Sequence, residues 1–197
     1  NKLAKAISAA IAISAIALTG CSEQQVEKPT SPELSEVVQQ QLNSVLREQS
    51  ESLSAEYAQM RANQVSNVNY KMSFDIGNQS QQFSGKTEIH FDLVKDNKNN
   101  LTIDFEEGKI NELLVNGKPA GFDYQKWFIA IPASELSEGR NVVTIDYTRD
   151  YSTDGSGFHR FVDPENQEVY LYTDFQPYDA NRLFPHFDQP DLKATYT

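Results

Sequence analysis

The stretch VSNVNYKMSFDI, residues 65–76, decides the fold, because apolar side chains alternate there with polar ones. Val68, Tyr70 and Met72 are separated by single polar residues, and the alternation continues to Ile76. A period of two is typical of a strand with one buried face and one solvated face. The stretch therefore predicts a half-buried antiparallel strand.

The same reading extends along the rest of the chain. A strong hairpin signal, Asn116-Gly117, follows a short apolar run. Many short strands with tight turns predict a mainly β fold, a two-sheet sandwich or a related open β architecture. The sequence has no Gly-rich phosphate loop and no βαβ rhythm, so we do not expect nucleotide binding. The further strands are expected at residues 83–93, 101–105, 113–115, 127–131, 142–147 and 169–175.

Upstream of residue 65 the apolar period changes from two to that of a helix. Apolar residues recur at helical spacing from Leu34 to Leu46 and continue more loosely to Met60. Ser31 is a suitable N-cap and Pro32 suits the first helical position. We expect one helix or two up to residue 63, with an apolar stripe that packs on a protein surface.

The first twenty residues predict a targeting segment. Lys2 and Lys5 precede a short apolar run, and the sequence LTGC ends at Cys21. The run is shorter than a membrane-spanning helix. It resembles a bacterial lipoprotein signal, which implies cleavage before Cys21, lipidation of its thiol and a place in the cell envelope. Ser22 favours the outer membrane by the same resemblance. The alternative is a plain secretory signal with an incidental cysteine.

These patterns divide the chain into three parts: a signal peptide at 1–20, a lipid-anchored linker and helix at 21–64, and a β domain at 65–197.

The composition limits the partners that we expect. The formal net charge is −11, and the Lys and Arg residues are scattered, so nucleic acid is not an expected partner. The acidity fits solubility outside the cytoplasm, with a cationic substrate as the alternative.

The segment GFHRFVDPENQEVYLYTDFQPYDANRLFPHFDQPDLKATYT, residues 157–197, carries a family resemblance. It resembles the N-terminal domain of the zinc aminopeptidases related to aminopeptidase N and leukotriene hydrolase. The resemblance implies a saddle-like antiparallel β domain packed against a thermolysin-like catalytic domain. It also implies that the full-length protein removes N-terminal residues from peptides. The positions in register are Thr173, Phe175, Pro177, Ala180, Arg182, Phe184, Pro185, Phe187, Asp188, Pro190, Lys193 and Ala194.

The resemblance also implies a substrate site. Asp174 stands where the family has Gln, and Gln176 stands where many members have a Glu that helps to bind the free α-amine of the substrate. Residues two apart on a strand point to the same side, so we expect these two side chains to project together. Our hypothesis is that the anionic partner of the ammonium group has moved to Asp174, while Gln176 keeps a neutral acceptor. The alternative is a solvated pair on an edge strand.

The chemistry of a zinc peptidase is not expected in this segment. The three histidines, His90, His159 and His186, form no H-E-x-x-H motif, and we expect structural or surface roles for them, with His159 in a Gly-rich loop. The resemblance implies that zinc is bound by a catalytic domain encoded beyond Thr197, and that the fragment alone is inactive. Ser156, between two glycines, is expected in a loop, because it lacks the strand–elbow–helix context of a nucleophilic serine.

The sequence also predicts local features near the C-terminal end. Residues 178–184 are expected to form a short helix, with Arg182 paired to a carboxylate such as Asp179 or Asp188. The aromatic residues Phe184, Phe187 and Tyr196 are expected in the core. The rival to the enzyme is a non-catalytic lipoprotein whose β-sandwich binds a glycan or a protein through exposed aromatic residues such as Tyr151, Tyr170 and Tyr172.

Overall fold

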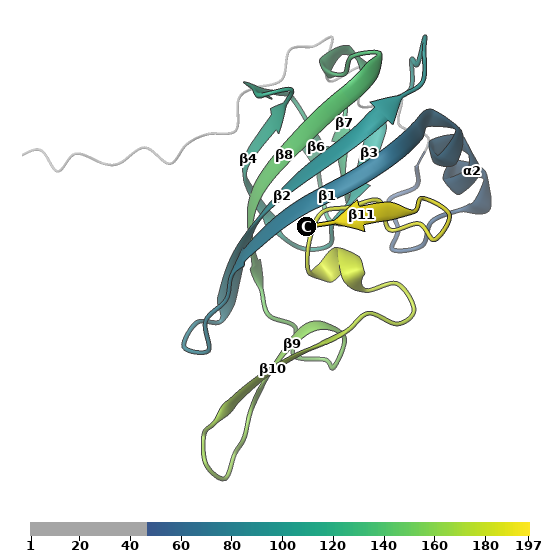
Figure 1. Ribbon diagram of the computed structural model, residues 1–197. Coiled ribbons are helices and arrows are strands. Elements are labelled where there is room, and N and C mark those ends of the chain that lie inside the picture. Colours follow the sequence, from purple (N-terminus) through teal and green to yellow (C-terminus); the bar gives the residue numbers. More distant parts are fainter. Residues whose placement is uncertain (1–46) are drawn as a thin grey trace, which may run out of the picture. The chain divides into compact units, whose positions relative to one another are not determined.

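The computed structural model describes residues 47–197. The expected signal peptide, Cys21, the linker and the first part of the expected helix lie outside these residues. One α-helix and eleven strands occupy the described part (Figure 1). They are α2 (Ala55–Gln64), β1 (Val65–Asp75), β2 (Gln82–Leu93), β3 (Leu101–Asp104), β4 (Lys109–Val115), β5 (Lys118–Pro119), β6 (Asp123–Tyr124), β7 (Phe128–Ile131), β8 (Gly139–Asp150), β9 (Gly157–Val162), β10 (Val169–Asp174) and β11 (Ala194–Tyr196).

Two sheets and one hairpin make up the β structure. The larger sheet has the order β11-β1-β2-β8-β4-β5, and the smaller has the order β3-β7-β6. All pairs are antiparallel except that of β11 with β1. β9 and β10 form a separate two-stranded hairpin, which Figure 1 shows standing away from the long strands. The mainly β, antiparallel fold expected from the sequence is confirmed.

The core lies between the two sheets. Along β8, alternate residues from Asn141 to Arg149 are buried, and β2 alternates in the same way. Every residue of β3 and β7 is buried. Each fully buried Val, Leu, Ile or Phe side chain contributes about 1.5–3 kcal/mol of hydrophobic free energy. The core side chains that are completely inaccessible include Ile89, Phe91, Leu101, Ile103, Phe105, Ile129, Ile131, Val143, Ile145 and Tyr147.

Helix α2 leads directly into the first strand. It ends at Gln64 and β1 begins at Val65, where the apolar period changes. The Ser54 hydroxyl accepts a hydrogen bond from the backbone N–H of Tyr57 at 3.2 Å and so caps the helix. Residues 47–54 are not helical, so one continuous helix up to residue 63 is excluded, and the described helix begins at Ala55.

The expected hairpin turn is confirmed. Asn116 and Gly117 join β4 to β5, and their φ angles are 52° and 77°. A two-residue hairpin of type I′ needs positive φ at both positions, which Asn and Gly adopt more readily than other residues.

Some aromatic residues lie elsewhere than expected. Phe184 and Phe187 are buried, as predicted, but the prediction for Tyr196 is wrong: its side chain is 59% exposed. It lies on β11, the edge strand, and its ring stacks on Tyr70 from outside. Tyr151, expected at the surface, is 5% exposed because it packs against Phe83 and Phe158 and its hydroxyl contacts Gly77.

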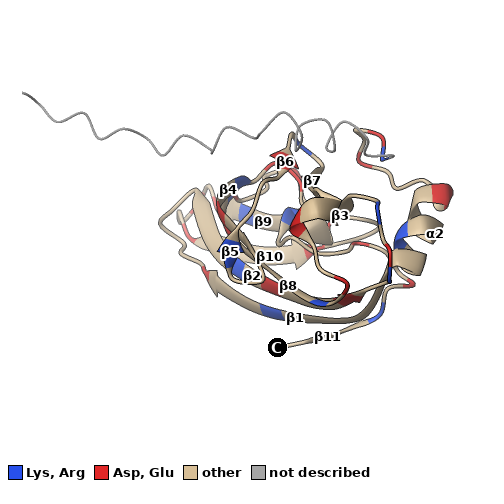
Figure 2. Ribbon diagram, turned by 90° about the horizontal axis from the view of Figure 1, so that it is seen from above, with Lys and Arg blue, Asp and Glu red and all other residues tan. Residues whose placement is uncertain are grey.

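Figure 2 shows basic residues spread singly over several elements, with acidic residues between them. Among the described residues, no helix has the length and apolar character that crossing a membrane requires.

Candidate functional site

The candidate site lies at the base of the β9–β10 hairpin. Asp174, the last residue of β10, pairs with Gly157, the first residue of β9. Gly157 has a φ of 70°, and a Cβ atom there would lie 2.9 Å from the Cβ of Arg182. Only glycine adopts this conformation without strain and allows the close approach. The hairpin therefore begins directly against Arg182, with Asp174 on the opposite strand.

Asp174 and Gln176 are joined by a local hydrogen bond to the Gln176 backbone, and not as neighbours on one face of a strand. Both side chains are exposed. β10 ends at Asp174, and Gln176 lies in the following turn, so the alternation that predicted a shared side does not extend to it. Instead, Oδ1 of Asp174 accepts a hydrogen bond from the backbone N–H of Gln176 at 3.2 Å. This Asx-type contact orients the carboxylate and leaves Oδ2 and the Gln176 amide available to a ligand.

Phe175, between Asp174 and Gln176, is half-buried and faces an apolar recess. Its half-buried ring lines an open, mainly apolar recess of about 550 Å³ together with Phe184, Phe187 and Tyr196. An aromatic ring packed on one side holds the polar residues on either side of it at the surface.

Arg182 connects the hairpin base to the loops around it. Its guanidinium lies 2.8 Å from Asp154 and 3.4 Å from Asp179. The pairing with Asp179 was predicted, and the closer pairing with Asp154 was not. Burial opposes the charge on Arg182, but the hydrogen bond and charge of Asp154 outweigh it and raise the pKa of the guanidinium. The short helix expected at 178–184 is a single 3-10 turn, η2 (Ala180–Arg182).

A polar recess of about 280 Å³ opens beside Arg182. One of its buried members, Arg149, is 5% exposed and donates to the carbonyl oxygens of Glu106 and Asp150 and to the Ser152 hydroxyl. Burial and the neighbouring charge of Arg182 lower the pKa of Arg149. The lining residues are Glu107, Arg149, Asp150, Tyr151, Ser152, Thr153, Asp154 and Arg182.

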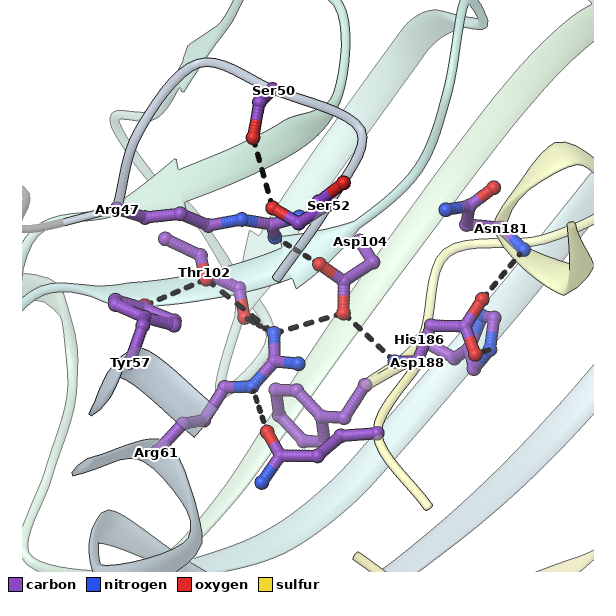
Figure 3. Close-up of polar contacts among 12 residues, drawn as sticks. Arg47, Ser50, Ser52, Tyr57, Arg61, Thr102, Asp104, Asn181, His186 and Asp188 are labelled. Carbon is purple, nitrogen blue, oxygen red and sulfur yellow. Dashed lines mark hydrogen bonds and ion pairs between the residues drawn. The ribbon is translucent and has the colours of Figure 1, made fainter. Parts of the chain in front are cut away.

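A buried charged cluster lies on the other side of η2 and was not predicted (Figure 3). Asp104, with no exposed surface, lies between Arg61 of α2, at 2.9 Å, and Arg47. Burial would raise the pKa of Asp104, but the two guanidinium groups outweigh it and hold that pKa below its usual value. Arg61 also donates to the Thr102 carbonyl at 3.2 Å. A buried carboxylate needs such partners, because an unpaired charge is expensive to desolvate.

The cluster holds the segment that follows η2. The backbone N–H of Asp188 donates to Oδ2 of Asp104 at 2.8 Å, and Arg61 Nε donates to the Gln189 side chain at 2.9 Å. The backbones of Asp104 and His186 exchange two hydrogen bonds, at 2.8 and 3.1 Å. Residues 186–189 are therefore tied to both β3 and α2. A charged residue between the apolar residues Ile103 and Phe105 is the sequence signal that could have revealed Asp104.

The histidines occupy separate places. His90, on β2, contacts Glu88 at 3.2 Å, and His186 is buried with its Nδ1 3.0 Å from the Phe184 carbonyl. His159 lies in β9 rather than in the expected loop, because Gly155 and Ser156 end the loop before it. Its Nδ1 accepts from the Gly155 N–H at 2.9 Å. Within residues 47–197, no three His, Cys, Asp or Glu side chains are grouped to hold a metal ion.

Comparison with known proteins places this geometry in a family. Residues 66–197 match the model of the peptidase M1 N-terminal domain. Aminopeptidase N of Streptomyces lividans is 33% identical over 149 residues, covering 74% of this chain and 17% of that protein. Glutamyl aminopeptidase of Rattus norvegicus is 28% identical over 145 residues, covering 66% and 15%. A probable M1 family aminopeptidase of Encephalitozoon cuniculi is 44% identical over 68 residues, covering 34% and 7%.

The chain thus spans less than a fifth of the length of these relatives. The matched residues include both sheets, the β9–β10 hairpin and the turn with Asp174 and Gln176. The chain belongs to the family of the peptidase M1 N-terminal domain.

Proposed function

We propose that this chain is the substrate-anchoring part of a zinc-dependent aminopeptidase, and that Asp174 and Gln176 receive the free α-amine of a peptide. A catalytic part of the full-length protein would bind the zinc ion and cleave the first peptide bond. Within residues 47–197 no group of side chains fits a zinc ion, and in this proposal the further part supplies the zinc ligands. Relatives with aminopeptidase names support the general class of activity.

One observation carries the assignment to these two residues. The Asp174 carboxylate is exposed, oriented by the Gln176 backbone and placed at the rim where the hairpin meets the sheets. An ammonium group requires acceptors that surround it and gains most from an ionised one. Asp174 Oδ2 and the Gln176 side-chain oxygen would supply one charged and one neutral acceptor from residues two positions apart, which suits a primary amine.

The test uses the full-length protein with Asp174→Asn. Hydrogen bonds to charged groups contribute about 1.5–3 kcal/mol, so we expect the KM for peptides with free N-termini to rise about tenfold or more. Asp75→Asn, at the exposed end of β1, is the matched control and should keep the KM of the wild type. An unchanged KM in Asp174→Asn would contradict the anchoring role.

We also propose that the protein is held in the cell envelope, on the outer membrane, by lipid attached to Cys21. The support is the charged start, the apolar run and the LTGC sequence. Two or three acyl chains, each burying methylenes at about 0.8 kcal/mol, make a stable anchor. Cys21→Ser should move the protein from the membrane fraction to the soluble fraction. A variant that stays in the membrane fraction would refute the anchor.

The rival proposal is a non-catalytic lipoprotein that binds a partner through its β domain. The observation that favours it is the exposure of Tyr170 and Tyr172, at 48% and 46%. Release of N-terminal residues from peptides by the full-length protein decides for the enzyme. Binding without hydrolysis decides for the rival.

A further inference from the structure

The β9–β10 hairpin carries aromatic rings on one face. Tyr172 pairs across the strands with His159, and Tyr170 pairs with Phe161. Residues directly opposite one another in an antiparallel pair share a face, and so do residues two apart on one strand. The ring centroids lie 4.7 Å apart in the first pair and 6.4 Å apart in the second. We call these four residues the aromatic ladder.

Three rings of the ladder face solvent, and hydrogen bonds orient two of its four members. Phe161, Tyr170 and Tyr172 are 47%, 48% and 46% exposed, whereas His159 is 6% exposed beneath Tyr172. The Gly155 N–H fixes the His159 ring through Nδ1, and the Tyr170 hydroxyl contacts Glu168 at 3.0 Å. Three half-exposed aromatic rings side by side are uncommon on a surface that meets only water, and such a patch marks an interaction site.

The ladder ends at the proposed amine anchor. Asp174 lies two residues after Tyr172 and pairs with Gly157, so its side chain is on the ladder face. A strand rises about 3.4 Å per residue, which puts the two rungs about 7 and 14 Å from Asp174. An extended peptide has the same rise. A peptide whose α-amine is at Asp174 therefore reaches the first rung about two residues along its chain and the second about four residues along.

We infer that the aromatic ladder is an extended subsite for the apolar side chains at the third and fifth residues of a peptide substrate. This inference rests on the proposed function. The Asp174 carboxylate at one end of the ladder complements an ammonium group, such as that of a peptide N-terminus or a lysine. This charge complementarity favours a peptide as the occupant over an apolar surface of another domain. The subsite favours peptides of five or more residues over aminoacyl amides.

The test compares two pentapeptides, Ala-Ala-Phe-Ala-Phe and Ala-Ala-Ser-Ala-Ser, as substrates of the full-length protein. Release of the first alanine gives kcat/KM for each. Aromatic contacts of this kind predict a preference of about 2- to 12-fold for the first peptide per rung engaged. Tyr172→Ser and Tyr170→Ser should each bring the ratio toward one, whereas Tyr172→Phe should retain it because the ring remains.

Val162→Ser is the matched control, because Val162 is 36% exposed on the opposite face of the same hairpin. Its ratio should equal that of the wild type. A wild-type ratio of one, or a ratio that survives both serine substitutions, overturns the subsite while leaving the aminopeptidase assignment intact. Serine variants that keep the ratio but lower the Tm of the full-length protein assign the ladder to an internal interface instead. No alanine release from either peptide overturns the proposed function and the subsite with it.

Discussion

A substitution at Arg61 tests directly how much the buried charged cluster contributes to the stability of the fold. Its side chain has no exposed surface, and its guanidinium contacts Asp104 at 2.9 Å, the Thr102 carbonyl at 3.2 Å and the Gln189 side chain at 2.9 Å. Arg61→Met keeps much of the aliphatic length and removes the charge with all three contacts. Asp104 then retains Arg47 and the Asp188 N–H as partners.

The expected loss is large. Breaking a buried ion pair by removing one partner costs about 3–5 kcal/mol, because the other charge stays buried. With an m-value of about 2 kcal/mol/M, the midpoint of urea unfolding falls by about 1.5–2.5 M. The assay is equilibrium urea unfolding of the chain, followed by circular dichroism and by tryptophan fluorescence.

Two further variants separate charge from packing. Arg140→Met, at an exposed position of β8, should change the free energy of unfolding by less than about 0.5 kcal/mol. The double variant Arg61→Met with Asp104→Leu should lose less than the sum of the two single losses, because both single losses include the Arg61–Asp104 contact. A loss under 1 kcal/mol in Arg61→Met, or strict additivity in the double variant, would refute the reasoning.

Two other predictions follow from the same geometry. Gly157→Ala should destabilise the chain by about 1–3 kcal/mol in urea unfolding, since the residue has a φ of 70° and its new Cβ would lie 2.9 Å from Arg182; Gly77→Ala, with nothing within 4 Å, is the control and should stay near wild type. The pKa of Asp104 is lowered in the folded state, so its stabilising effect is complete above the unfolded value of about 3.9 and is lost as pH falls through the folded value. The stability gap between wild type and Asp104→Asn should therefore shrink below about pH 4, and a constant gap would contradict the ion pair.

Alternation made the long strands predictable. β2 and β8 each bury one face, so their sequences carry the period-two signal directly. β9 was missed because its start, Gly157-Phe158-His159-Arg160, mixes turn-forming and polar residues. Only its first three residues, Gly157 to His159, are buried, so burial does not alternate along the strand. β10 ends at Asp174, one residue earlier than expected. Pro177, which has no backbone N–H to donate, lies three residues after that end and so did not mark it.

The buried charges could not be derived in the same way. Arg61 and Asp104 are 43 positions apart, and the sequence around each residue gives no sign that the two residues form an ion pair. Charged residues on a helix such as α2 are usually solvated, and only the packing of α2 against β3 reverses that expectation. The exposure of Tyr196 has a related cause. Its strand pattern is that of a buried residue, but β11 is the edge of the sheet, and no described element covers its outer face.

The position of the proposed amine anchor depends on the core through a short series of contacts. A two-stranded hairpin is marginally stable by itself, so β9 and β10 need support to hold Asp174 in one place. The Ser152 backbone, bonded to Phe158 and Arg160, and the buried Phe158 ring give part of that support. Arg182, which belongs to η2 and lies against Gly157, gives another part. η2 is in turn held by the Glu106 N–H, which donates to the Asn181 carbonyl at 3.0 Å, next to Asp104 on the same chain segment. Substitutions in the buried cluster should therefore affect peptide binding at the proposed anchor as well as stability.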